Sequence, residues 1–320
     1  MKPMQETVCF NSHEAWSFFP DANTFENFKE KILPKIYLKN EVPEDVKKSF
    51  EVIQNLLDHS YCEYEFLDVA VVKALTTFEM SLKIRYAQIK NESPGKRKLQ
   101  GLIDVFRKEG YFESDYIEFF THVRDVRNLI THPHMHTIGG IFWTRWILNA
   151  SCLINDLYED EALRNQRKRK RNKILSVLDP LVDNGAELIF KGKPYWIQVS
   201  QLIFIDNKNM PELICFGFVP RFNMEERKSR DIADFDSEFP FVFCTDDYHY
   251  NPASRAISLK KISDDQFVYI RPLQDVELIS QYKDWEQQLA SNLELRFYYS
   301  NYIEKLNMEF LPRWQAFHMR

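Results

Sequence analysis

Apolar residues recur three or four positions apart along most of the first half of the chain. This spacing is typical of helices that bury one face and expose the other. It predicts helices over residues 46–57, 64–89, 99–110, 114–132 and 141–178. No strand pattern interrupts residues 43–178, so we expect an all-α bundle there, with residues 1–42 packing on it as a short arm.

The pattern changes after Pro180, where short runs of β-branched and aromatic residues follow one another between turn signals. These runs predict strands over residues 187–190, 195–204, 213–219, 239–243 and 266–270. A final helical stripe extends over residues 285–311. The predicted fold class is therefore α+β: a helical bundle over residues 43–178, a linker over 179–184, a β-rich domain over 185–282 and a closing C-terminal helix over 283–320.

The helix predicted over residues 114–132 stops at Pro133, because proline opposes the continuation of a helix. At 100° per residue, one narrow stripe faces the bundle and consists of Phe119, Val123, Val126 and Ile130. The opposite side carries Arg124, Asn128, Thr131 and His132. Arg127 lies at the edge, about 140° from His132 on a straight helix. The two side chains therefore meet only if the last turn is distorted or if a second copy of the chain completes the site; a twofold dimer is the commonest oligomer.

The residue types at this helix end suit cleavage of RNA by its own 2′-hydroxyl group. His132 can take up or donate a proton near neutral pH, which contributes about 10²–10⁴-fold to a rate. Arg127, and also Arg124, can stabilise charge on the phosphoryl oxygens. Asn128 lies four residues before His132 and can orient it. The reaction needs neither a metal nor a cofactor.

Glu79 lies at the edge of the apolar stripe predicted for residues 64–89. A carboxylate there either pairs with another helix or supports Arg127, and we favour support, because burial without a partner is costly. The alternative for the whole helix end is structural: Arg127 forms a cap or salt bridge, and His132 bonds the terminal carbonyl groups.

Residues Arg127-Asn128-x-x-x-His132 at a late helix end resemble the R-x4-6-H motif of the HEPN superfamily of helical ribonucleases and nucleotide-binding domains. The upstream segments over residues 74–83 and 99–110 look similar too, so the resemblance covers roughly residues 43–165. It implies a homodimer with paired motif helices and, in active members, metal-independent endoribonuclease activity; many members serve in toxin–antitoxin systems or in defence against phage. Members modified by a partner nucleotidyltransferase carry a tyrosine shortly after the histidine, whereas His134 and Met135 follow Pro133 here. The sequence therefore does not favour that kind of toxin.

Composition limits the other functions. Only 8 glycines occur and no glycine-rich phosphate loop is present, which disfavours nucleotide-binding Rossmann and P-loop folds. The 5 cysteines are scattered and odd in number, so we expect free thiols rather than zinc or disulfides. No signal peptide and no apolar run of about 20 residues is visible, which predicts a cytoplasmic protein that does not enter the membrane. Because the net charge is −5, any contact with RNA must be local.

The strongest local charge is the run over residues 164–173, in which 7 of 10 residues are basic. Within this run, the residues that could hold an RNA backbone are Arg167, Lys168, Arg169, Lys170 and Arg171. The alternative, which we favour, is a solvated helix face balanced by the acidic residues 159–161.

Two weaker patterns could bind a metal. His132, His134 and His136 alternate, so an extended segment would present them on one side, but solvated histidines are the favoured interpretation. Asp246, Asp247 and His249 could form a hydrolase site, but a turn between strands explains them better. No metal site is predicted.

The sequence thus predicts a metal-independent endoribonuclease of HEPN type that acts as a homodimer on RNA, with a β-rich domain that senses a ligand or protein partner or restrains the nuclease. The alternative is a non-catalytic protein whose helical domain dimerises, binds nucleic acid or senses a ligand.

Overall fold

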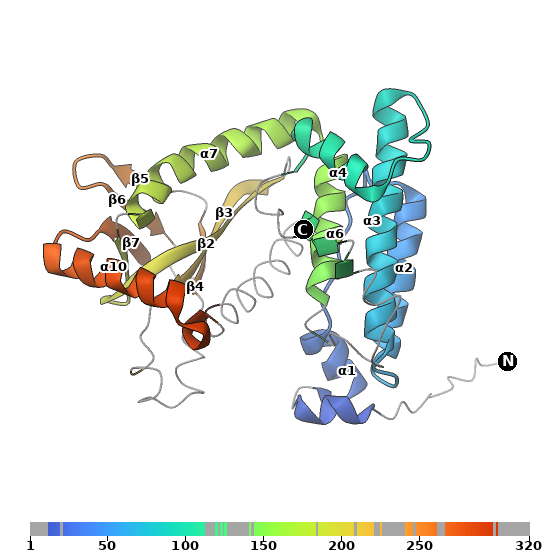
Figure 1. Cartoon of the computed structure of the whole chain (residues 1–320), viewed down its shortest axis with the longest axis horizontal. Helices are drawn as coiled ribbons and strands as arrows, with labels where there is room; N and C mark the ends of the chain where they lie inside the picture. Colours follow the sequence, from blue (N-terminus) through green and yellow to red (C-terminus); the bar gives the residue numbers. More distant parts are fainter. Residues whose placement is uncertain are drawn as a thin grey trace. The chain divides into compact units, whose positions relative to one another are not determined.

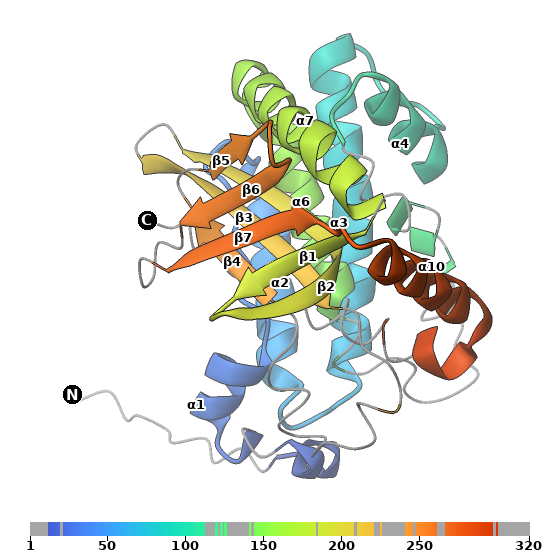
Figure 2. The same ribbon diagram turned by 90° about the vertical axis from the view of Figure 1, so that its left-hand side faces the viewer.

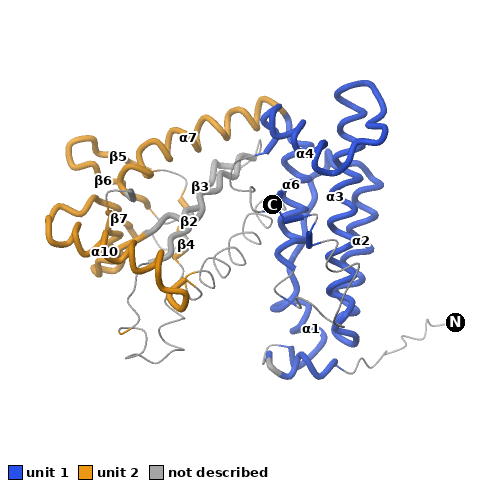
Figure 3. The backbone as a smooth tube through the Cα atoms, in the orientation of Figure 1, with its two compact units in different colours: residues 1–160 blue, residues 161–320 orange. Residues whose placement is uncertain are grey.

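A computed structural model describes residues 12–19, 22–112, 119–120, 122–123, 125–126, 141, 144–183, 185–207, 210–220, 225, 241–245, 248–260, 266–296 and 299, of which residues 18, 182–183, 198–207, 210–220, 242 and 244 are described by their backbone alone. The chain forms two compact units, Met1–Asp160 and Glu161–Arg320 (Figure 3). The first is helical and the second combines an antiparallel sheet with helices. The predicted α+β fold class is confirmed.

The helical unit is built around α3 (Phe66–Lys90), which packs against both α2 (Glu44–His59) and α6 (Thr144–Tyr158) (Figure 1). The shorter α4 (Leu99–Lys108) also contacts α3. These bounds lie close to those predicted for α2, α3 and α4, because each helix has a strong apolar stripe and a clear end. The end of α3, for example, is set by Asn91, which adopts the left-handed conformation with φ of 51°.

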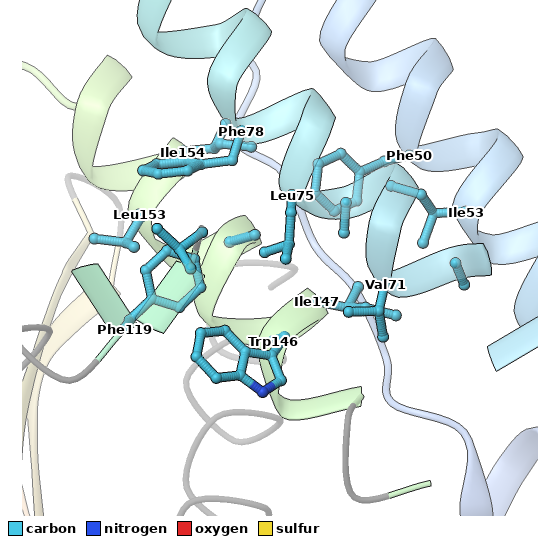
Figure 4. Packing of buried hydrophobic residues seen from close by; sticks show 14 of the residues in the cluster. Phe50, Ile53, Val71, Leu75, Phe78, Phe119, Trp146, Ile147, Leu153 and Ile154 are labelled. Atoms are coloured by element: carbon cyan, nitrogen blue, oxygen red, sulfur yellow. The ribbon is translucent and has the colours of Figure 1, made fainter. Parts of the chain in front are cut away.

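The core of this unit lies where α2, α3 and α6 meet (Figure 4). Phe50 and Ile53 of α2 face Val71 and Leu75 of α3, and α6 contributes buried side chains of its own. The fully buried apolar residues of α6 in this core are Ile147, Ala150, Leu153, Ile154 and Leu157. A core of this kind holds the three helices in one orientation.

The described part of the N-terminal arm packs on the helices. It contains η1 (Glu14–Phe18), α1 (Phe25–Asn27) and η3 (Phe28–Ile32). Trp16 and Phe28 are buried, with ring centroids 4.6 Å apart, and Trp16 Nε1 donates a hydrogen bond to the carbonyl oxygen of Ser60 at 2.9 Å. Asn155 of α6 then fixes the following segment, because its side chain accepts from the Lys39 N–H at 2.8 Å and donates to the carbonyl oxygen of Tyr37 at 2.9 Å.

The single helix predicted over residues 141–178 is wrong, because the structure has two helices, α6 and α7 (Glu161–Asp183). The break falls at residues 159–160, where Lys39 Nζ forms an ion pair with Glu159 Oε1 at 2.8 Å. The division between the units comes after Asp160, so α7 belongs to the sheet unit, whereas the predicted bundle extended to residue 178 and the predicted linker began after it.

The seven strands that the structure describes in the second unit are antiparallel to their neighbours, in the order β4-β3-β2-β1-β7-β6-β5. Their bounds are β1 Ala186–Phe190, β2 Lys193–Asn207, β3 Met210–Pro220, β4 Phe241–Thr245, β5 Tyr248–Asn251, β6 Ala256–Lys260 and β7 Phe267–Pro272. The long β2 pairs with β1 near its start and with β3 along its remainder, and its register shifts between Val199 and Gln201. α7 lies along β2 and reaches β1 and β7.

The sheet is strongly curved. β1 and β4 are separated by two strands, a distance of about 14 Å on a flat sheet. Yet the ring of Phe190 on β1 lies 5.3 Å from that of Phe243 and 5.7 Å from that of Phe241 on β4. The concave face therefore carries the core, which also includes the buried residues Leu188, Ile197, Ile257, Leu259, Val268 and Ile270.

Two strands and part of a helix were missed by the sequence prediction. β5 includes His249, which was assigned to a turn, and β6 was not predicted. The closing helix α10 (Val276–Ser291) begins earlier than expected, because Asp275 caps it: Asp275 Oδ1 accepts from the Glu277 N–H at 2.7 Å. The presence of a closing helix is confirmed, but α10 ends at Ser291, and residues 297–298 and 300–311 of the predicted span lie outside the described residues.

Candidate functional site

The segment that leads into the candidate motif is helical at residues 119–120, 122–123 and 125–126. Phe119, Phe120, Val123 and Val126 are buried, whereas His122 and Asp125 are exposed. The predicted stripe therefore faces the bundle at its three described positions. Ile130, its fourth member, lies outside the described residues.

Aromatic contacts anchor this segment to the helices around it. The ring of Phe119 lies 5.5 Å from that of Phe78 on α3 and 5.2 Å from that of Trp146 on α6 (Figure 4). The ring of Phe120 lies 5.1 Å from that of Phe112, which follows α4. This helical segment thus contacts α3, α6 and the residue Phe112 after α4 through rings that are almost fully buried, which fixes where the chain enters the motif.

The motif itself comes immediately after Val126. Arg127, Asn128 and His132, together with Arg124 on the preceding turn, lie outside the described residues. Their predicted roles in proton transfer and phosphate binding, and the predicted sharing of the site between two chains, stay predictions.

Glu79 is described, and its carboxylate is part of an ion pair within α3. Lys83 Nζ lies 2.6 Å from Glu79 Oε1, one helical turn away, and both side chains are partly exposed. A pair of this kind stabilises a helix by about 0.3–0.5 kcal/mol. The ion pair gives Glu79 a structural role, while its predicted support of Arg127 stays a prediction.

The residues of the basic run are divided between the buried and the exposed face of α7. Arg167 and Arg171 expose only 7% and 9% of their surfaces, whereas Arg169 is exposed and Lys168 and Lys170 are partly exposed. A guanidinium group that is this deeply buried does not reach a phosphate in solvent. Arg167 and Arg171 are therefore poor candidates for the predicted RNA contact, and the run is not a uniformly solvated face either.

The spacing along α7 explains the division and could have revealed it. The buried residues recur three or four positions apart, in the series Arg164, Arg167, Arg171, Ile174, Leu178 and Leu181. The arginines continue the apolar stripe of the same helix, so their stems pack where leucine or isoleucine would. Charge alone concealed this stripe in the sequence.

A second polar cluster joins α3 to α6 through Arg85, which the sequence did not single out. Its guanidinium carbon lies 5.8 Å from the ring of Tyr111 and 5.5 Å from the ring of Tyr158. Tyr158 donates a hydrogen bond to the carbonyl oxygen of Ser81 at 3.1 Å, and burial raises the pKa of its phenol. A cation between two rings contributes packing energy rather than chemistry.

No group of three or more potential metal ligands occurs among the residues that the structure describes. His132, His134, His136, Asp246 and Asp247 lie outside them, and His249 is exposed on β5. Cys62 and Cys152 are free thiols, as predicted, and burial raises the pKa of Cys62. Within the described helices, none has the length and apolar character needed to cross a bilayer.

A pair of exposed aromatic residues on β7 was also missed. Phe267 and Tyr269 expose 52% and 46% of their surfaces, while Val268 and Ile270 between and beyond them are buried. All four residues are apolar or aromatic, so the sequence alone did not indicate which pair faces solvent. The alternation of strand side chains between two faces does place Phe267 and Tyr269 on one face and Val268 and Ile270 on the other.

Comparison with protein-family models, with curated proteins and with solved structures finds no match to any of them.

Proposed function

We propose that the protein is a metal-independent endoribonuclease in which Arg127 and His132 form the reactive site, completed across a homodimer. The observation that carries the proposal is the buried stripe of Phe119, Val123 and Val126. It anchors the helix to the bundle up to the residue before Arg127, on a rigid base of the kind that a catalytic group requires.

The chemistry follows from the residue types. The 2′-hydroxyl oxygen of one nucleotide attacks the adjacent phosphorus, the bond to the 5′-oxygen of the next nucleotide breaks, and a 2′,3′-cyclic phosphate forms. His132 removes the proton from the attacking hydroxyl or supplies the one that the leaving oxygen requires. Arg127 stabilises the charge that grows on the phosphoryl oxygens, with Arg124 as a second cation, and Asn128 orients His132.

The proposal is tested by incubating the protein with structured and single-stranded RNA in the presence and absence of EDTA. We expect cleavage that EDTA does not abolish and products that end in a 2′,3′-cyclic phosphate. His132→Ala should lower the rate by about 10²–10⁴-fold, and Arg127→Ala by about 10²–10³-fold.

Two further variants sharpen this assay. His122 is an exposed histidine earlier on the same helix, so His122→Ala should leave the rate unchanged. Arg127→Lys keeps the charge but loses the planar fork, and should restore only part of the activity. Cleavage that is the same in Arg127→Ala, His132→Ala and the wild-type protein would contradict the site assignment.

A second candidate function is a non-catalytic interaction protein. It is favoured by three apolar side chains that are exposed on α2 and α3, namely Val52, Phe66 and Val69. If Val69→Asp abolishes self-association in sedimentation experiments and no RNA is cleaved by the wild-type protein, this second function is supported and the nuclease is rejected.

A further inference from the structure

The convex face of the sheet presents two aromatic rings to solvent. Phe267 and Tyr269 lie two residues apart on β7, so both side chains project from the same face. Their ring centroids are 6.2 Å apart and their planes differ by 22°, an offset-stacked pair. Figure 2 shows β6, β7 and β1 side by side in the middle of this sheet.

The rings are not part of the core of the unit. That core lies on the opposite, concave face, where Val268 and Ile270 of the same strand are buried. An aromatic ring left in water costs free energy that burial would recover, at about 25 cal/mol per Å² of apolar surface. Two such rings, adjacent and parallel, form a surface that suits another flat, partly apolar group.

The spacing of the rings favours an extended single strand over a duplex. Successive stacked nucleotides in a helix rise by about 3.4 Å. The rings of Phe267 and Tyr269 are separated by 6.2 Å, so two bases can stack on separate rings only if the strand between them is extended. Aromatic residues on an open sheet are a general means of binding unpaired bases, because every base has a flat face.

The polar neighbours of the rings suit a phosphate backbone. Lys260 on β6 is the direct cross-strand partner of Phe267, and Ser258 is the partner of Tyr269, so both share the face of the rings. Arg271 follows Tyr269 on the same face and donates from Nε to Oε1 of Glu187, its partner on β1. Exposed His249 continues the row beyond Ser258. Glu187 is the one carboxylate among the described cross-strand partners of β7, and Arg271 compensates its charge.

We infer that this face, centred on Phe267 and Tyr269, binds single-stranded RNA, with bases stacked on the rings and the backbone held by Lys260 and Arg271. The choice of RNA rests on the function proposed above. Stacking contributes affinity with little sequence preference, because it uses no base edge. The sheet unit would thus hold the substrate class on which the helical unit acts.

The test uses fluorescence anisotropy with the full chain and a labelled oligouridylate whose 2′-hydroxyls are methylated. This probe is not open to attack by a 2′-hydroxyl, so binding is measured whether or not the protein cleaves RNA. Phe267→Ala and Tyr269→Ala should each raise the Kd roughly five- to 150-fold. Tyr269→Phe, which keeps the ring, should retain the affinity, and Phe267→Leu, which keeps an apolar side chain without the ring, should lose it.

Val276→Ala is the matched control, because Val276 is also an exposed apolar residue of this unit but lies on α10. An absence of binding by the wild-type protein, or a loss in Phe267→Ala and Tyr269→Ala no larger than in Val276→Ala, would overturn the inference. So would a duplex that binds as well as the single strand. Single-stranded DNA that binds more tightly than RNA would overturn the assignment to RNA.

Two charge variants should change the affinity for RNA in opposite directions. Lys260→Gln should weaken binding. It should also make the fall of log affinity with log salt less steep, by about 0.7 in the slope. Glu187→Gln should strengthen binding, because it releases the exposed Arg271 from its carboxylate and removes a negative charge from the face. Equal effects of Lys260→Gln and Glu187→Gln on affinity would contradict a polyanionic ligand here. Loss of cleavage with intact binding would reject the proposed nuclease alone.

Discussion

The two units of this chain use their aromatic residues differently. In the helical unit, Phe78, Phe119 and Trp146 are buried, and Phe119 contacts Phe78 edge-on and Trp146 at a tilt, so that it joins its own segment to α3 and α6. In the sheet unit, the buried rings of Phe241 and Phe243 and the partly buried ring of Phe190 lie together on the concave face, but Phe267 and Tyr269 on β7 remain in solvent.

The difference separates residues that stabilise the fold from residues that are free to bind. Truncating a buried ring removes its contacts and lowers the free energy of unfolding, whereas truncating a ring in solvent does not. A substitution series across both units therefore distinguishes a structural aromatic from a functional one, and the following variants are designed to test that distinction.

The largest effect is expected from Phe78→Ala. Phe78 is fully buried, and its removal leaves a cavity beside Phe112 and Phe119. We expect a loss of about 3–5 kcal/mol in the free energy of unfolding, measured by urea denaturation. Phe267→Ala in the sheet unit should change it by about 0.5 kcal/mol or less. A large loss from Phe267→Ala would contradict the description of its ring as unused by the core.

A similar contrast separates two ion pairs of the helical unit. The pair of Lys39 with Glu159 is largely buried, whereas that of Lys83 with Glu79 is partly exposed. Lys39→Met removes the ammonium from a buried carboxylate and should cost about 3 kcal/mol. Lys83→Met should cost about 0.5 kcal/mol or less. Equal losses in urea denaturation would mean that burial does not decide the strength of these pairs.

The sheet unit also has a closely packed point, at Gly185. Its φ is +92°, and a Cβ atom there would lie 3.0 Å from Leu273 Cδ1 and 3.2 Å from Tyr282 Cγ of α10. Gly192 also has a positive φ of +75°, but a Cβ atom there would meet nothing within 4 Å. We expect Gly192→Ala to cost about 1 kcal/mol for its backbone conformation, and Gly185→Ala about 1–3 kcal/mol more for the clash. Thermal unfolding of the two variants measures the difference. Equal Tm values would indicate that α10 shifts to make room for the added Cβ atom.

The smallest effect on stability is expected from Arg169→Gln on α7. Arg169 is exposed, whereas Arg167 is buried on the same helix. Arg169→Gln should leave the free energy of unfolding within about 0.5 kcal/mol, while Arg167→Gln should lower it by about 1–3 kcal/mol. If the two variants were equally stable, the stripe of arginines would not be packed as the structure has it.

Helices with an apolar stripe and local end signals could be predicted from the sequence. The ends of α2 and α3 depend on residues such as Glu44 and Asn91, which act within one turn of themselves. The break between α6 and α7 could not be predicted, because Lys39 pairs with Glu159 from 120 residues away. No glycine or proline marks that break in the sequence.

The sheet was predicted less completely for a different reason. Tyr248–Asn251 and Ala256–Lys260 are short, and their alternation is concealed by polar residues such as His249 and Ser258 that face solvent. Curvature is also invisible in the sequence, since it is seen only in contacts between strands that are not neighbours, such as Phe190 of β1 with Phe243 of β4. For the candidate site, the sequence predicted the buried positions Phe119, Val123 and Val126, whereas the roles of Arg127 and His132 stay predictions. It did not reveal that Arg167 and Arg171 are buried or that Phe267 and Tyr269 are exposed.

The central claim, a nuclease site shared by two chains, is tested most directly by mixing two inactive variants. Arg127→Ala and His132→Ala chains are unfolded together, refolded and assayed for RNA cleavage. If each site takes its arginine from one chain and its histidine from the other, a mixed dimer has one intact site. The mixture should then recover about a quarter of the wild-type rate, since roughly half of the dimers are mixed and each has one of two sites. A mixture as inactive as either variant alone, while the wild-type protein is active, would contradict the shared site.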